Sequence, residues 1–184
     1  MWKSISPSPH ISILAVSPHD SHILYAGESP PFASDHADTF GSTALFKSTD
    51  AGASWMPGSA GLPSNSARLH DIVFDPQHSD ILYAGGWHAP EGRLTGVIFK
   101  STDAGRTWTQ VLELEGGMFR ALAVDSHNPH ILYAGSSGKI QEPGFFRSVD
   151  GGRSWKKVHS GQAVALAIDP HGSNAVYVGM RHEA

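Results

Sequence analysis

The sequence predicts an all-β protein built from β-propeller blades of four antiparallel strands, with about 3.5 blades in 184 residues. Two repeated strings predict this fold. A polar turn of the form S-x-D-x-G-x-x-W occurs three times, and a strand-like string close to ILYAG occurs four times. The tyrosines of the second string, at positions 25, 83, 133 and 177, recur at intervals close to one propeller blade, about 40–50 residues. The 20 glycines and 12 prolines favour many turns over long helices.

The first strand of each unit is a short and nearly continuous apolar run, such as Ile72-Val73-Phe74 or Leu122-Ala123-Val124. Continuity predicts that both faces of the strand are buried, as expected next to the central axis of a propeller. A turn built on Asp or Ser follows, often with Pro, as in Asp75-Pro76. Proline fixes φ there, and the Asp or Ser oxygen can accept a local backbone hydrogen bond.

The second strand is the ILYAG string, which is rich in large β-formers and ends at glycine. The third strand is "ALFK", "VIFK" or "GFFR", with an outward Lys or Arg before the repeated turn. The fourth strand begins at the tryptophan, as in "WTQVL" and "WKKVH". The repeated turn is therefore expected to be the hairpin between the third and fourth strands.

Each residue type in this turn has an expected structural role. The aspartate can accept bonds from loop N–H groups, the glycine can adopt a positive φ, and the serine can tie the base of the loop. The tryptophan is large enough to fill the gap to a neighbouring sheet. The twelve residues are Ser48, Asp50, Gly52, Trp55, Ser101, Asp103, Gly105, Trp108, Ser148, Asp150, Gly152 and Trp155.

These turns resemble the Asp-box, also called the bacterial neuraminidase repeat of sialidase-like propellers. The resemblance extends from about Ile11 to Gly179. The repeats of this chain are similar to those of xyloglucanase-, sortilin- and photosystem-stability-factor-type propellers. In these families the box is a structural turn, so the resemblance implies the fold and gives the three aspartates a structural rather than a catalytic role. It also points to an extracellular or periplasmic location. The N-terminal stretch, however, lacks the apolar core of a signal peptide.

We expect residues 1–184 to form one partial propeller, with blades at about 11–57, 68–112 and 118–158 and an incomplete blade at 163–179. Propellers normally close with about 4–8 blades. Trp2–Ile5 resembles the start of a fourth strand and could close a small ring with the last unit. Alternatively, the chain is an arc of a longer propeller or one half of a ring made by two copies. An open arc exposes apolar faces and strand edges, which predicts self-association or partner docking through the terminal blades.

Composition narrows the partners. The formal charge of −4 gives no basic footprint, so no nucleic acid is expected, and no apolar run is long enough for membrane insertion. The absence of cysteine excludes disulfides and cysteine-based zinc sites. The two H-x-x-H pairs, which start at His19 and His127, fall in turns rather than on a helix. No metal and no cofactor are therefore expected, and the partner is expected to be a protein or a carbohydrate.

The links from strand two to three and from strand four to the next strand one open on the same face of a propeller. They correspond to residues 28–42, 86–95 and 136–144, with 57–67 and 113–118. Carboxylates beside an aromatic ring suit a sugar, because the ring stacks and the acids bond hydroxyls; solvated loops are the alternative. The candidate ligand-binding residues are Asp35, His36, Trp87, His88, Glu91, Arg93, Arg120 and Lys139.

Asp71 is a further candidate because it falls in the first strand of the second unit, where we align Ala15, Ala121 and Ala165 in the other units. A polar residue that replaces a small apolar one near the ring centre indicates a site. The alternative is local pairing of Asp71 with Arg68 or Arg120. His70 and Arg120 share a second column, in which the last unit has Val164.

Three classes of function compete: a non-catalytic module that binds a glycan or a protein, a glycoside hydrolase or a fragment of one, and an assembly factor of the photosystem-stability type. Sialidases need an arginine trio, and this chain has no F-R-I-P-like string. "MFRALAV" is the nearest match. Xyloglucan-cleaving endoglucanases resemble the repeats more closely, but they need two carboxylates across a cleft, one of them in a D-x-G-G stretch that is missing here. The carboxylates nearest to a catalytic role are Asp71, Glu28 and Asp38. We therefore predict a binding module rather than an enzyme.

Overall fold

The computed structural model describes residues 6–7, 11–28, 45–63, 67–138, 143–171 and 175–181. Over these residues the chain forms strands joined by turns, with one 3₁₀ turn, η1, at Pro90–Gly92. No helix in this part of the chain is long and apolar enough to cross a membrane. The predicted all-β class is therefore confirmed.

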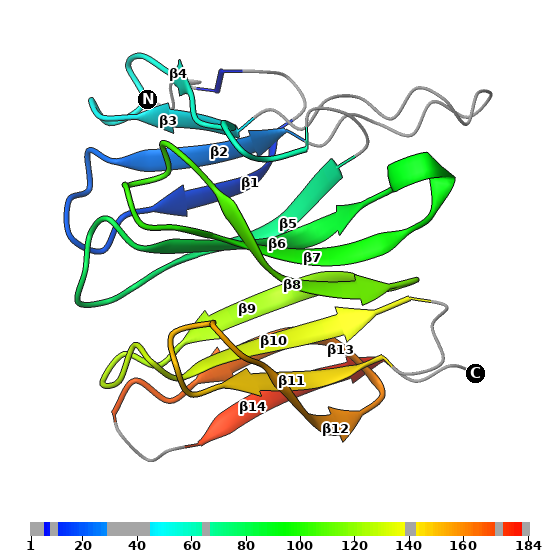
Figure 1. The fold of residues 1–184 in the computed structure, drawn as a ribbon. Helices are drawn as coiled ribbons and strands as arrows, with labels where there is room; N and C mark the ends of the chain where they lie inside the picture. Colours follow the sequence, from blue (N-terminus) through cyan, green and yellow to red (C-terminus); the bar gives the residue numbers. More distant parts are fainter. Residues whose placement is uncertain are drawn as a thin grey trace.

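The strands form four antiparallel sheets, and within each sheet every strand pairs with its neighbour in sequence (Figure 1). Three sheets have four strands and the last has two. The first sheet contains β1 (Ile11–Val16), β2 (Leu24–Glu28), β3 (Leu45–Ser48) and β4 (Met56–Pro57); the second contains β5 (Ala67–Phe74), β6 (Leu82–His88), β7 (Thr95–Ser101) and β8 (Thr109–Glu115); the third contains β9 (Met118–Val124), β10 (Leu132–Ser137), β11 (Gly144–Ser148) and β12 (Lys156–Ser160); the fourth contains β13 (Gln162–Ile168) and β14 (Val176–Arg181).

The first strands of successive sheets lie next to one another, β1 against β5, β5 against β9 and β9 against β13. The sheets are therefore arranged like segments of a fan, with their first strands innermost. This is the arrangement of propeller blades, and the described residues form a partial propeller.

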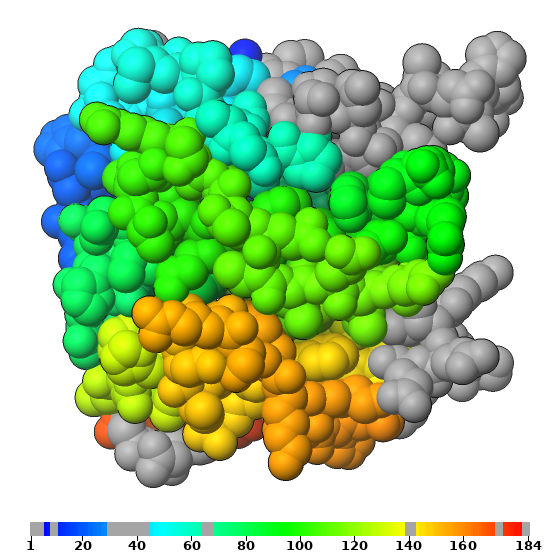
Figure 2. Space-filling model, viewed as in Figure 1, coloured from blue at the N-terminus to red at the C-terminus, as the bar shows by residue number. Residues whose placement is uncertain are grey.

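The core lies between the sheets rather than within any one of them. One cluster joins the first and second sheets through Tyr25, Leu45, Leu69 and Phe99, and another joins the second and third sheets through Tyr83, Ile98, Phe119 and Phe146. Figure 2 shows the surfaces of the successive sheets in contact with one another. Because each sheet is apolar on both faces, a blade is stabilised only when a neighbour covers it.

The three turns Ser48–Trp55, Ser101–Trp108 and Ser148–Trp155, which we call the Asp turns, share one hydrogen-bond pattern. In the second of them, Ser101 Oγ donates to Asp103 Oδ1 at 2.8 Å and accepts from the N–H of Gly105 at 2.9 Å. The equivalent bonds in the other two turns have the same lengths within 0.1 Å. Gly52, Gly105 and Gly152 all have positive φ, as the sequence predicts. The turn is thus held by its own side chains.

The position before the tryptophan completes the turn and was not singled out from the sequence. Thr107 donates from both its N–H and its hydroxyl to the two carboxylate oxygens of Asp103, at 2.8 Å and 2.6 Å. Ser54 and Ser154 make the same pair of bonds to their aspartates. The signal was available, because all three copies carry Ser or Thr at this position.

The second and third Asp turns are also fastened to the preceding sheet. Tyr83 on β6 and Lys100 on β7 both donate to the carbonyl oxygen of Gly151, at 2.9 Å and 2.8 Å. Tyr25 on β2 and Lys47 on β3 make the same pair of bonds to the carbonyl of Ala104. This Tyr–Lys clamp connects sheet to sheet by polar contacts that add to the apolar packing between the sheets.

The first strands share a β-bulge that the sequence did not indicate. The pairing skips one residue in each: Ser12 in β1, His70 in β5, Arg120 in β9 and Val164 in β13. The register also corrects our alignment of the first unit. Asp71 pairs with Gly85, and the equivalent Gly27 pairs with Ile13 rather than with Ala15.

Candidate functional site

A polar pocket opens where three of these bulges converge. It has a volume of about 440 Å³ and is lined by His70, Arg120, Ser137, Val164 and Arg181. His70, Arg120 and Val164 are the bulged residues of β5, β9 and β13, whereas Ser137 and Arg181 end β10 and β14. A bulge changes the direction of the side chain of its extra residue, and here the bulged residues of three successive sheets line one pocket.

The two arginines give this pocket a positive character. Arg120 Nε donates to Ser137 Oγ at 3.1 Å, which fixes the guanidinium against the end of β10. Burial lowers the pKa of Arg120 from its usual value, and the like charge of Arg181 acts in the same direction. Both effects reflect a cation that is poorly compensated within the described residues.

His70 contributes a neutral imidazole. Burial lowers the pKa of His70 to about 4, and the positive charges of Arg120 and Arg68 act in the same direction. Near neutral pH the ring is therefore uncharged, so one nitrogen donates and the other accepts. Its Nε2 is buried and has no hydrogen-bond partner among the described residues. A buried polar atom without a partner costs free energy.

Asp71 follows His70 in sequence, but it is not among the residues that line the pocket. Its Oδ2 accepts the N–H of Leu122, on the neighbouring strand β9, at 2.8 Å. Burial raises the pKa of Asp71, and the backbone hydrogen bonds from Leu122 and Ile72 oppose this shift. The Asp71 carboxylate thus links the second and third sheets.

Trp87 and His88 lie within β6 rather than in a loop. The Trp87 side chain is 5% exposed, and the Arg68 guanidinium lies 5.9 Å from the centre of its ring. Burial lowers the pKa of His88, against the opposing charge of Glu113. Trp87 therefore presents little ring surface for a sugar to stack on.

The other predicted candidates are dispersed. Glu91 is in η1 with a positive φ of 51°, and Arg93 forms an exposed ion pair with Glu115. Glu28 ends β2. Four further candidates, Asp35, His36, Asp38 and Lys139, lie outside the described residues.

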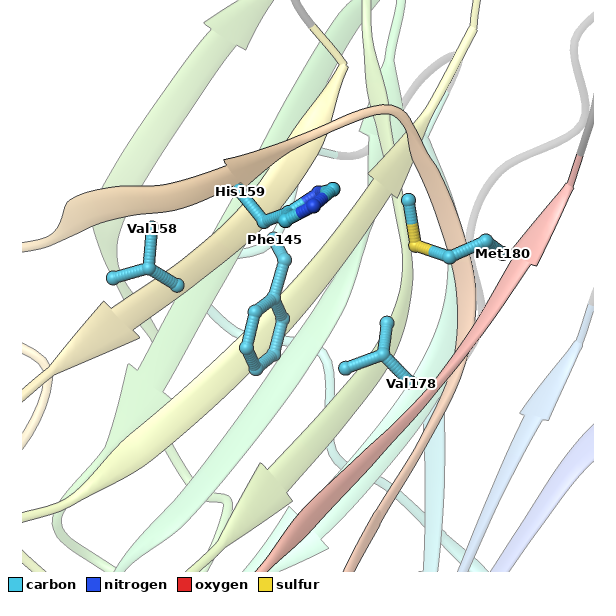
Figure 3. Close-up of a pocket in the computed structure, with 5 residues that line it drawn as sticks. All are labelled: Phe145, Val158, His159, Val178 and Met180. Atoms are coloured by element: carbon cyan, nitrogen blue, oxygen red, sulfur yellow. The ribbon is translucent and has the colours of Figure 1, made fainter.

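A second pocket is apolar and lies between the outer strands of the third sheet and β14 (Figure 3). It has a volume of about 410 Å³ and is lined by Phe145, Val158, His159, Val178 and Met180. Such a pocket offers packing surface but few groups that could orient a small polar ligand.

No protein-family model matches the chain. A xyloglucanase from Hypocrea jecorina (strain QM6a) is 32% identical over 137 residues, which is 66% of this chain and 16% of that protein. The chain therefore spans about one sixth of the length of this curated relative.

Solved structures agree with the fold. The GH74 xyloglucanase from Xanthomonas campestris has a TM-score of 0.68 and 22% identity over 93% of this chain and 27% of its own. The protein YCF48 bound to D1 peptide has a TM-score of 0.56 and 18% identity over 89% of this chain and 45% of its own. These similarities define the class of protein, a β-propeller of which the chain covers part.

Proposed function

We propose that the chain is a non-catalytic propeller module that binds a partner through the polar pocket. The observation that carries this proposal is the lining of the pocket: two arginines, a histidine, a serine and a valine, with no carboxylate among its described lining residues. Most glycoside hydrolases act with two carboxyl groups that flank the scissile bond, about 5–9.5 Å apart. The polar pocket offers cations and neutral donors instead, which suit binding.

The similarity to xyloglucanases supports a second proposal, which concerns the repeats. We propose that the three Asp turns are Asp-boxes and that residues 1–184 belong to a single partial propeller. In each Asp turn the carboxylate accepts bonds from the serine at the start and from the Ser or Thr before the tryptophan. These carboxylates are occupied by their own turn, which supports a structural role.

The test of this function is an assay of reducing-end release from xyloglucan by the chain alone. We expect no release above that of a heat-denatured sample. The variants Asp71→Asn and Asp38→Asn, and Glu28→Gln, should remain folded by circular dichroism. Hydrolysis by the parent chain that one of these substitutions abolished would establish the competing function, a glycoside hydrolase.

A protein partner is supported by the similarity to YCF48, a protein whose solved structure holds a D1 peptide. We favour a protein over a neutral glycan because the polar pocket is charged and because the ring of Trp87 is covered. An assembly role of the photosystem-stability type is the second function that this similarity supports.

The terminal sheets also favour association with a second copy. Large apolar side chains are exposed on both of them: Leu14 and Val16 on β1 are 60% and 51% exposed, and Tyr177 on β14 is 66% exposed. Sedimentation velocity should show concentration-dependent association that Leu14→Ser and Tyr177→Ser weaken. A compact monomer at micromolar concentration would exclude this part of the proposal.

A further inference from the structure

We propose that the polar pocket captures the terminal carboxylate of a peptide whose last side chain is aliphatic. This inference rests on the proposed binding function and names its ligand.

The donors converge because the repeat places equivalent positions at one point. Arg120 and His70 are the bulged residues of adjacent sheets, whereas Ser137 and Arg181 each lie two residues after the pairing glycine of their second strand, Gly135 or Gly179. Side chains from three sheets therefore line one cavity without any loop. Donors held on strands are better fixed than donors on loops, which favours recognition of a defined group.

The charge of the pocket calls for an anion. Arg120 and Arg181 bring two like charges together. The carboxylate of Asp71, which follows His70 in sequence, accepts the backbone N–H of Leu122, and Asp71 does not line the pocket. Arginine forks match planar carboxylates, to which they can donate two parallel hydrogen bonds. The Ser137 hydroxyl and the His70 ring can supply further donors to the same oxygens.

Val164, the apolar residue of the lining, favours a peptide C-terminus over the carboxylate of a uronic acid. Val164 is 37% exposed and lines the cavity together with the charged residues, so the bound group also meets an aliphatic surface. The last residue of a peptide carries both its carboxylate and its side chain, here an aliphatic one, on the same Cα atom. A uronic acid presents hydroxyls instead, and the ring of Trp87, on which it could stack, is 5% exposed.

The test is calorimetric titration with the peptide acetyl-Gly-Gly-Val, compared with the same peptide amidated at its C-terminus. We expect amidation to weaken binding roughly 10-fold or more, because it removes a charge-assisted contact. Arg181→Gln should weaken binding of the peptide acid and leave the affinity for the amidated peptide unchanged. Arg181 is exposed, so this substitution should not disturb folding, and Arg120→Gln serves as the second variant.

Three outcomes would overturn the inference. They are equal affinity for the acid and the amidated peptide, tighter binding of galacturonate than of the peptide, and displacement of the bound peptide by inorganic phosphate at the same concentration as by free peptide. Xyloglucan hydrolysis is a separate readout. A chain that neither hydrolyses xyloglucan nor distinguishes acid from amide would refute the ligand and leave the binding function standing.

Discussion

At the scale of single residues, two neighbouring positions in the second Asp turn provide a matched comparison. Ala104 and Gly105 both have positive φ, 57° and 73°. A Cβ at Gly105 would lie 2.6 Å from a ring carbon of Tyr25, whereas Ala104 already carries its Cβ. Gly105→Ala should therefore lower the free energy of unfolding by about 2 kcal/mol or more, from strain and overpacking together.

The control is Ala104→Gly, which relieves the left-handed strain at the neighbouring residue. We expect this variant to be unchanged or more stable by up to about 1 kcal/mol. Urea denaturation followed by tryptophan fluorescence measures both variants. Equal effects of the two substitutions would show that the contact with Tyr25 does not constrain the turn.

The Asp turns also predict a response to acid. Hydrogen bonds from Thr107, with the bond from Ser101, lower the pKa of Asp103 to about 2 from its usual 3.8, and Ser54 and Ser48 do the same for Asp50. Because the folded pKa is the lower one, the ionised carboxylates stabilise the fold above about pH 4, and this contribution is lost as the pH falls toward 2. Thermal unfolding at a series of pH values should show the melting temperature falling through this window, and Asp103→Asn should make the fall shallower. An unchanged slope would contradict the assignment.

At the scale of elements, the Tyr–Lys clamp can be tested within the chain itself. Lys100→Met removes a 2.8 Å bond to the Gly151 carbonyl and should lower the free energy of unfolding by about 1 kcal/mol. Arg147 on β11 occupies the equivalent position of the third sheet, and its Nε is buried with no hydrogen-bond partner among the described residues. Arg147→Met should therefore cost less. A larger loss for Arg147→Met would show that the clamp does not hold the sheets together.

The same elements show which features the sequence could predict. The strands and the Asp turns follow from repeated local patterns, such as the ILYAG string and the glycine at Gly105, and the structure has them where the repeats fall. The bulges were not predictable, because an apolar run such as ISILAV gives no cue to the skipped residue. The misplacement of Ala15 has a different cause, because Ile13 precedes the turn residue Ser17 by four positions, as Asp71 precedes Asp75.

Trp87 shows a second limit of local patterns. The sequence predicts that the strand ends at Gly85 and that residues 86–95 form a link, yet β6 continues to His88. The reason is that Gly86 allows a close approach to β5, where an added Cβ would lie 1.9 Å from the carbonyl oxygen of Arg68. The sequence did place His70 and Arg120 in one column, but Ser137 and Arg181 join them only through the packing of three sheets.

At the scale of the whole molecule, the fan arrangement of the sheets brings β5, β9 and β13 together. The Tyr–Lys clamp fastens the first sheet to the second Asp turn and the second sheet to the third Asp turn. The polar pocket exists only because the bulges of β5, β9 and β13 meet. The partner binding that we propose therefore depends on the assembled sheets rather than on any single repeat.

The most direct measurement of this claim is amide chemical-shift mapping during titration with acetyl-Gly-Gly-Val. The account predicts that shifts appear together at His70, Arg120 and Arg181, on three different sheets, and saturate with one common dissociation constant. Shifts confined to the 89–94 link, around Glu91 and Arg93, would contradict it.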